Sequence, residues 1–161
     1  MLFFLSRYLW LSLLFITPLL ADESSSQKVL ETQVQRDLLQ SIRPYAITFG
    51  QGETELHIFI DPYCHYSQDY LEAILQQDEQ KFQENSYFFY LYEIYYTDAT
   101  EIIQTIMVSD DREKTLTEIM VTDTIVMSEE DHRSDYEIEA IADVARELGV
   151  DRRPFIITIK K

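Results

Sequence analysis

The sequence predicts a single α/β domain, and three observations support this. The chain has 161 residues, which is enough for one compact domain. Apolar residues make up 46% of it, with only three glycines and four prolines, as is typical of a chain with a packed core. Segments with strand character alternate with segments whose apolar residues recur at helical spacing, which predicts a parallel strand–helix–strand unit.

The first 21 residues differ from the rest of the chain. Arg7 is the one charged residue there, an apolar block runs from Tyr8 to Thr17, and Ala21 ends the segment. This pattern predicts a secretory signal peptide over residues 1–21 and therefore export. The apolar block is shorter than the about 20 residues that a transmembrane helix needs. The alternative is an uncleaved anchor, and only in that case do we expect contact with a membrane.

Two further regions follow the predicted signal peptide. Residues 22–43 are expected to hold a linker, over 22–28, and an amphipathic helix over about 29–42, where apolar residues recur every four positions. Pro44 ends this helix. Residues 44–161 are expected to form the folded domain.

Within that domain, strand and helix patterns follow one another. Strands over 45–49 and 56–60 flank a short glycine-containing turn, which predicts a hairpin, and the second strand is apolar enough to be central. The later elements expected are a helix over 67–81, a strand over 87–96, two short helices over 99–122, a helix from Ser128 to Gly149 and a strand over 155–159.

Cys64 is the only cysteine, so the chain cannot form an internal disulfide. It follows the predicted central strand and precedes a predicted helix. Unpaired N–H groups and the positive end of a helix favour a thiolate at such a position, and the thiolate is the form that attacks disulfides. The alternative is a small buried hydrophobic residue without chemistry, because free cysteine is often buried.

Two segments resemble the thioredoxin-fold thiol–disulfide proteins of the bacterial periplasm, most of all the DsbC and DsbG isomerase branch. The first is Phe59-Ile60-Asp61-Pro62-Tyr63-Cys64-His65-Tyr66-Ser67-Gln68, which is similar to the active-site segment of that branch. The second is Gly149-Val150-Asp151-Arg152-Arg153-Pro154-Phe155-Ile156-Ile157, which is similar to the segment around the family's cis-proline. The resemblance implies a thioredoxin-like fold with a helical insertion, a periplasmic location, and Pro154 as a cis-proline against Cys64.

Two departures from the family limit what the resemblance implies. Ser67 stands where the second, resolving cysteine would be, and a serine hydroxyl cannot release a mixed disulfide. The chain ends at Lys161, so we expect the fold to stop after the strand that follows Pro154, where a full thioredoxin domain continues with a strand and a helix. The dimerisation domain of DsbC-type isomerases is also not expected.

The candidate catalytic residues are Cys64, Ser67, His65 and Pro154. Ser67 is expected to donate a hydrogen bond to the thiolate or, alternatively, to be an ordinary residue of the first helical turn. A protonated His65 would favour the thiolate, and the alternative is an exposed histidine without a role. Tyr63, Tyr66 and Arg153 are the candidate substrate-binding residues.

Arg153 stands where the family usually has a small or β-branched residue. We expect it to place a positive charge near Cys64 or to bind an acidic partner. The alternative is that Arg152 and Arg153 are a solvated pair in a loop.

Charge and composition exclude other classes of function. The net charge of −16 disfavours nucleic acid and anionic lipid as partners, and serves solubility or, alternatively, binding of a basic protein. One cysteine and three histidines without zinc spacing predict no metal, and no other cofactor is expected.

The sequence therefore predicts two alternative functions. The first is monothiol exchange, in which Cys64 forms a mixed disulfide with protein thiols or disulfides of exported proteins, and a redox partner or small thiol releases it. The alternative is a non-catalytic binding or chaperone-like module of an envelope or secretion assembly.

Overall fold

The computed structural model describes residues 22–93, 98–122, 124 and 132–160. The chain divides into two units, residues 1–36 and residues 37–161, and the boundary falls within helix α1 (Asp22–Ile42). The helix thus begins at Asp22, so the prediction of a linker over 22–28 is wrong, because loop-forming residue types are only a weak guide to local structure. Among the described residues, no helix combines the length and apolar character that crossing a bilayer requires.

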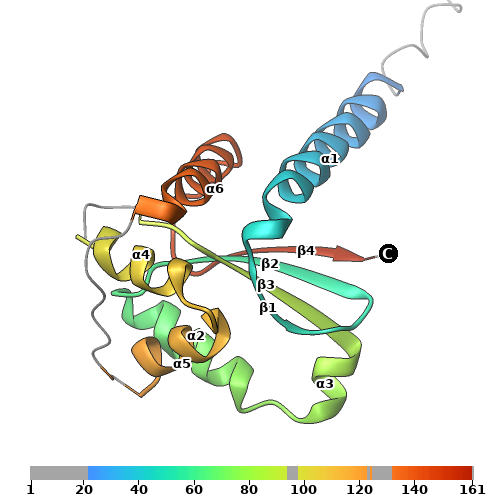
Figure 1. Ribbon diagram of the computed structural model, residues 1–161. Coiled ribbons are helices and arrows are strands. Elements are labelled where there is room, and N and C mark those ends of the chain that lie inside the picture. Colours follow the sequence, from blue (N-terminus) through green and yellow to red (C-terminus); the bar gives the residue numbers. More distant parts are fainter. Residues whose placement is uncertain (1–21, 94–97, 123, 125–131, 161) are drawn as a thin grey trace, which may run out of the picture. The chain divides into compact units, whose positions relative to one another are not determined.

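A four-stranded mixed sheet forms the centre of the second unit (Figure 1). Its strands, in chain order, are β1 (Ile47–Gly50), β2 (Thr54–Ile60), β3 (Asn85–Leu91) and β4 (Phe155–Lys160). In space the order is β1-β3-β2-β4. Strand β2 runs parallel to β3 and antiparallel to β4, and β1 is antiparallel to β3. The central position of β2 and the parallel strand–helix–strand unit are therefore confirmed.

The predicted hairpin of the first two strands is wrong, because β3 lies between them. The backbone of the connecting turn is bound elsewhere. The N–H of Gln51 donates to the carbonyl of Phe82 at 2.9 Å, and the N–H of Gly52 donates to the carbonyl of Asn85 at 3.1 Å. These bonds hold the turn against helix α3 (Glu79–Glu84) and the first residue of β3, and β1 pairs with the edge of β3 that faces away from β2.

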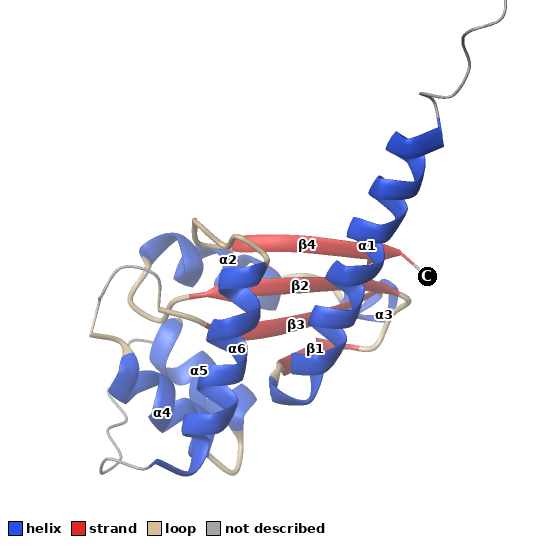
Figure 2. Cartoon of the chain, turned by 90° about the horizontal axis from the view of Figure 1, so that it is seen from above, coloured by secondary structure: helices blue, strands red, loops and turns tan. Residues whose placement is uncertain are grey.

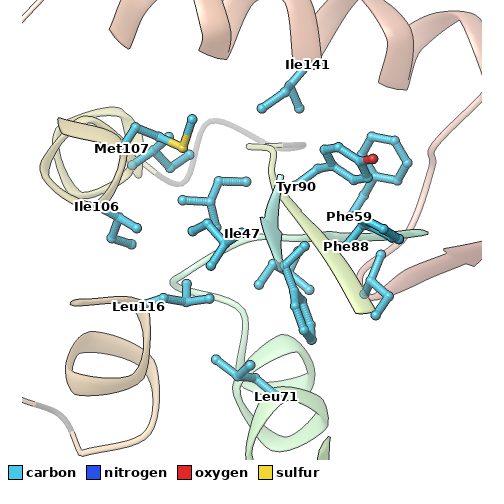
Figure 3. Close-up of a cluster of buried hydrophobic side chains, with 14 of the residues drawn as sticks. Ile47, Phe59, Leu71, Phe88, Tyr90, Ile106, Met107, Leu116 and Ile141 are labelled. Atoms are coloured by element: carbon cyan, nitrogen blue, oxygen red, sulfur yellow. The ribbon is translucent and has the colours of Figure 1, made fainter. Parts of the chain in front are cut away.

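Helices cover both faces of the sheet. They are α2 (His65–Leu75), α3 (Glu79–Glu84), α4 (Thr100–Val108), α5 (Arg112–Met120) and α6 (Asp135–Glu147), with short 3₁₀ turns at Arg43–Tyr45 and His132–Ser134. Figure 1 shows α6 on one side of the sheet and α2, α3 and α5 on the other, and Figure 2 gives the view from above. In Figure 3, Ile141 of α6 points towards the core from one side and Leu71 of α2 from the other.

The helix predicted over 67–81 is two helices in the structure. Helix α2 begins two residues earlier and ends at Leu75, and α3 begins after Asp78. The carboxylate of Asp78 accepts the N–H of Lys81 at 3.0 Å, which caps α3 and accounts for the break.

Of the remaining predicted elements, some are confirmed and others are shorter than expected or lie outside the described residues. The two short helices within 99–122 are confirmed as α4 and α5. The long strand predicted over 87–96 ends at Leu91, and part of it lies outside the described residues. The helix start predicted at Ser128 also lies outside them, while Gly149 follows the end of α6 with a φ of 68°.

Candidate thiol site at the carboxyl end of strand β2

Cys64 lies where the central strand passes into helix α2. Strand β2 ends at Ile60, a turn follows, and Cys64 is the residue that caps α2. Its carbonyl accepts the N–H groups of Ser67 at 2.8 Å and Gln68 at 3.0 Å, so the helix opens directly after the cysteine. The thiol side chain is partly exposed and free of any disulfide.

This position brings the thiol next to the positive end of an 11-residue helix. The side chain of Cys64 forms no capping hydrogen bond with the helix. First-turn N–H groups and the helix dipole both favour a negative charge at this end. Because Cys64 is accessible in part, the arrangement fits a reactive thiol better than a fully buried one.

Ser67 is fully buried in the first turn of α2. Its Oγ atom accepts the backbone N–H of Asp61 at 3.3 Å. The hydroxyl therefore ties the first turn of α2 back to the end of strand β2. A hydrogen bond from this hydroxyl to the thiolate stays a prediction.

Asp61 is also part of the site, although the sequence predicts it only as one residue of the motif and not as a candidate site residue. Its carboxylate is fully buried. The Oδ1 atom accepts the N–H of Tyr63 at 2.8 Å, and the Oδ2 atom accepts a hydrogen bond from Nη1 of Arg153. An aspartate that accepts the N–H two residues on, before proline, is a recognisable turn signal. That signal predicts the turn but not the arginine, which is 92 positions away.

The two neighbouring arginines, predicted as a charged group near Cys64 or as a solvated pair, have different surroundings. Arg152 is exposed and pairs with Asp151 at 3.0 Å, as the solvated alternative expects. Arg153 is only 15% exposed, and its charge is opposed by the carboxylate of Asp61. The guanidinium of Arg153 therefore faces a buried carboxylate, and an effect of its charge on Cys64 stays a prediction. The peptide bond between Arg153 and Pro154 is cis.

Three further candidate residues, Tyr63, His65 and Tyr66, are exposed neighbours of Cys64 in the chain. Tyr63 is 53% exposed and Tyr66 is 71% exposed, on the two sides of Cys64 in the chain. The imidazole of His65 is also exposed and its Nε2 atom lies 3.1 Å from the carboxylate of Asp69. The imidazole of His65 therefore faces the carboxylate of Asp69, which lies one turn further along α2. Among the described residues, no group of three His, Cys, Asp or Glu is placed to hold a metal ion.

Comparison with known proteins identifies similar solved structures. Neither a protein-family model nor a curated protein matches the chain. A disulfide interchange protein from Neisseria gonorrhoeae is 15% identical, with a TM-score of 0.56 over 73% of this chain and 85% of that one. DsbG from Helicobacter pylori is 18% identical, with a TM-score of 0.58 over 85% of this chain and 67% of that one.

A third similar structure is a periplasmic thioredoxin-like protein from Salmonella enterica serovar Typhimurium. It is 17% identical, with a TM-score of 0.50 over 75% of this chain and 83% of that one. At such identities the likeness establishes the fold. Helices α4 and α5, which lie between β3 and α6 in the chain, correspond to the expected helical insertion. The chain has the thioredoxin-like fold, as the resemblance of its two segments to the DsbC and DsbG branch implies.

Proposed function

We propose that the chain is an exported thioredoxin-like protein that takes part in thiol–disulfide exchange through Cys64. One observation carries the proposal: the single thiol is partly exposed at the start of the helix that follows the central strand. Two similar solved structures are a disulfide interchange protein and a DsbG, which supports exchange as the chemistry. The periplasm is the proposed location, supported by the predicted signal peptide and by a similar structure described as periplasmic.

The proposed reaction is an exchange without net oxidation. The Cys64 thiolate attacks one sulfur of a substrate disulfide, a bond forms between these two sulfurs, and the original disulfide bond breaks. The second substrate sulfur leaves as a thiolate and takes a proton from water. A thiolate of the same substrate, or of a small thiol, then attacks the substrate sulfur of the mixed disulfide. A new disulfide forms at that sulfur, and Cys64 leaves as its thiolate.

Ser67 sets the limit of this chemistry. A resolving cysteine at this position would attack the mixed disulfide from within the chain, and a serine hydroxyl does not. Isomerisation or monothiol exchange on exported proteins is therefore the proposed activity. Pro154 and the exposed rings of Tyr63 and Tyr66 are proposed to bind the substrate segment beside the thiol.

A non-catalytic binding module is the second candidate. The buried hydroxyl of Ser67 favours it, because that group is engaged with the backbone of Asp61 rather than exposed for chemistry. In this case the same surface binds a protein of an envelope or secretion assembly without forming a covalent bond.

The rate at which the purified protein reacts with a peptide disulfide distinguishes the two functions. We expect a mixed disulfide, seen by mass spectrometry, that persists until a small thiol is added. A Cys64→Ser variant is the control and forms none. A folded protein whose Cys64 reacts no faster than the free amino acid at neutral pH contradicts exchange and favours the binding module.

A further inference from the structure

All four polar groups of Asp61 are engaged around the candidate site. Its N–H donates to Oγ of Ser67 at 3.3 Å, and its carbonyl accepts the N–H of Cys64 at 3.0 Å. Its carboxylate accepts the N–H of Tyr63 through Oδ1 and Nη1 of Arg153 through Oδ2. One residue thus connects the turn before the thiol, the first turn of α2 and the loop before Pro154.

Burial makes the contact between Asp61 and Arg153 consequential. The carboxylate is 0% exposed and the arginine side chain 15% exposed, so both charges are largely removed from water. When one partner of such a pair is removed, the other remains as an uncompensated buried charge. The loop that carries Arg153 is therefore fastened to the turn that carries Cys64.

We propose that Asp61 is a positioning residue: through Arg153 it fixes residues 153–154 relative to Cys64. The inference rests on the proposed function. A substrate segment bound beside Pro154 must present its sulfur to Cys64, so the relative placement of the two loops sets the rate of exchange. A small disulfide reagent reaches the thiol without binding that loop, and its rate is insensitive to the placement.

This role differs from the one that the sequence suggests for Arg153. If the guanidinium acted on Cys64 through its charge, its loss would slow every disulfide equally. If Arg153 acts through Asp61, its loss slows substrates that bind the loop and spares small reagents. The ratio of two rate constants therefore separates the two roles, and it does not depend on the intrinsic reactivity of the thiol.

The test compares two disulfides that release the same chromophore on reaction with Cys64. One is dithiodipyridine, and the other is a short uncharged peptide whose cysteine carries a thiopyridyl group. Rate constants are measured for the wild type, Asp61→Asn, Arg153→Gln and the double variant. We expect the peptide-to-reagent ratio to fall roughly tenfold in each single variant, because a misplacement of about 1 Å costs up to ~100-fold in rate.

The double variant is the most informative member of the set. Its two neutral amides leave no buried charge and can still form a hydrogen bond with each other. The peptide-to-reagent ratio of the double variant should therefore be close to that of the wild type. Arg153→Lys, which keeps the charge that faces Asp61, should also restore much of it. Thermal unfolding of each variant identifies any loss of ratio that follows from loss of the fold.

Arg152→Gln is the matched control, because it removes the same charge one residue earlier from an exposed pair. Its ratio should equal that of the wild type. The inference is overturned if Arg152→Gln lowers the ratio as much as Arg153→Gln, or if the losses in the double variant simply multiply. A wild-type protein that reacts with neither disulfide overturns the proposed function instead.

Discussion

The Nδ1 atom of His57 lies 2.9 Å from the hydroxyl oxygen of Tyr90, and both side chains are buried. The imidazole stacks on the ring of Phe88, with 5.0 Å between ring centroids, and its Nε2 atom is 3.6 Å from the carboxylate of Glu55. Burial lowers the pKa of His57 below its ordinary value of 6.5, and the charge of Glu55 opposes this only in part. The folded protein therefore binds this proton less readily than the unfolded chain does.

The first prediction concerns stability as a function of pH. Because the pKa of His57 is lowered on folding, the free energy of unfolding should fall as the pH drops below the ordinary value of 6.5. Urea unfolding at a series of pH values down to the range where carboxylates titrate measures this slope. In His57→Gln the slope should be smaller than in the wild type. An equal slope in the variant and the wild type would contradict the assignment to His57.

The second prediction concerns the turn between β1 and β2. A Cβ atom on Gly52 would lie 1.9 Å from the carbonyl carbon of Glu84 and 2.1 Å from the backbone nitrogen of Asn85. Since backbone atoms cannot yield as a side chain can, Gly52→Ala should lower the free energy of unfolding by about 3 kcal/mol. Denaturant unfolding provides the measurement.

Gly149 provides the comparison for that variant. A Cβ atom there meets nothing within 4 Å, and only the positive φ of 68° opposes a side chain. Gly149→Ala should therefore cost about 1 kcal/mol. If Gly149→Ala is the more destabilising of the two, the packing of the turn against Glu84 and Asn85 is not as described.

The third prediction restores the second thiol. Ser67 is buried beside the end of β2 and its N–H donates to the carbonyl of Cys64 at 2.8 Å, so a cysteine at 67 would lie within the first turn of the same helix. Ser67→Cys should gain reduction of insulin disulfides by dithiothreitol and should no longer accumulate the mixed disulfide. The same substitution in a Cys64→Ser background should gain nothing. A Ser67→Cys protein that still accumulates the mixed disulfide would show that position 67 does not resolve it.

The fourth prediction tests the exposed ring of Tyr66. Tyr66 is 71% exposed beside Cys64, and Tyr136, on α6, is 73% exposed. Both Tyr→Ala variants should leave the free energy of unfolding within about 0.5 kcal/mol of the wild type. Only Tyr66→Ala should slow exchange with a peptide that has an aromatic residue beside its disulfide, by roughly fivefold. Equal rates for the two variants would exclude Tyr66 from substrate binding.

Local patterns in the sequence predict most of the elements but not how they pair. The apolar run after Leu56 and the helical spacing around Ile103 and Leu116 lead directly to β2, α4 and α5, because burial of one face leaves a periodic signal. The hairpin prediction fails for the opposite reason. A glycine-containing turn shows that the chain reverses, and the bonds from Gln51 and Gly52 to a later segment decide which strand becomes the neighbour.

The candidate site likewise has one feature that the sequence predicts and one that it does not. The position of Cys64 follows from the strand and helix on either side of it, which are visible locally. The pairing of Asp61 with Arg153 has no local signal, because either residue alone is compatible with an exposed loop. Only the folded chain shows that one arginine of the pair is buried against a carboxylate and that its neighbour is exposed.

The insertion of β3 between β1 and β2 also bears on how the chain folds. Strands that are adjacent in sequence, β1 and β2, do not pair, so their turn offers no local nucleus for the sheet. The parallel pair of β2 and β3 closes only after the chain between Ile60 and Asn85 has crossed over, and contacts of that separation slow folding. The same event forms the bond from the N–H of Tyr92 to the carbonyl of Ile60 at 2.8 Å, next to the turn that holds the thiol. We therefore expect the surroundings of Cys64 to be complete only once β2 and β3 have paired.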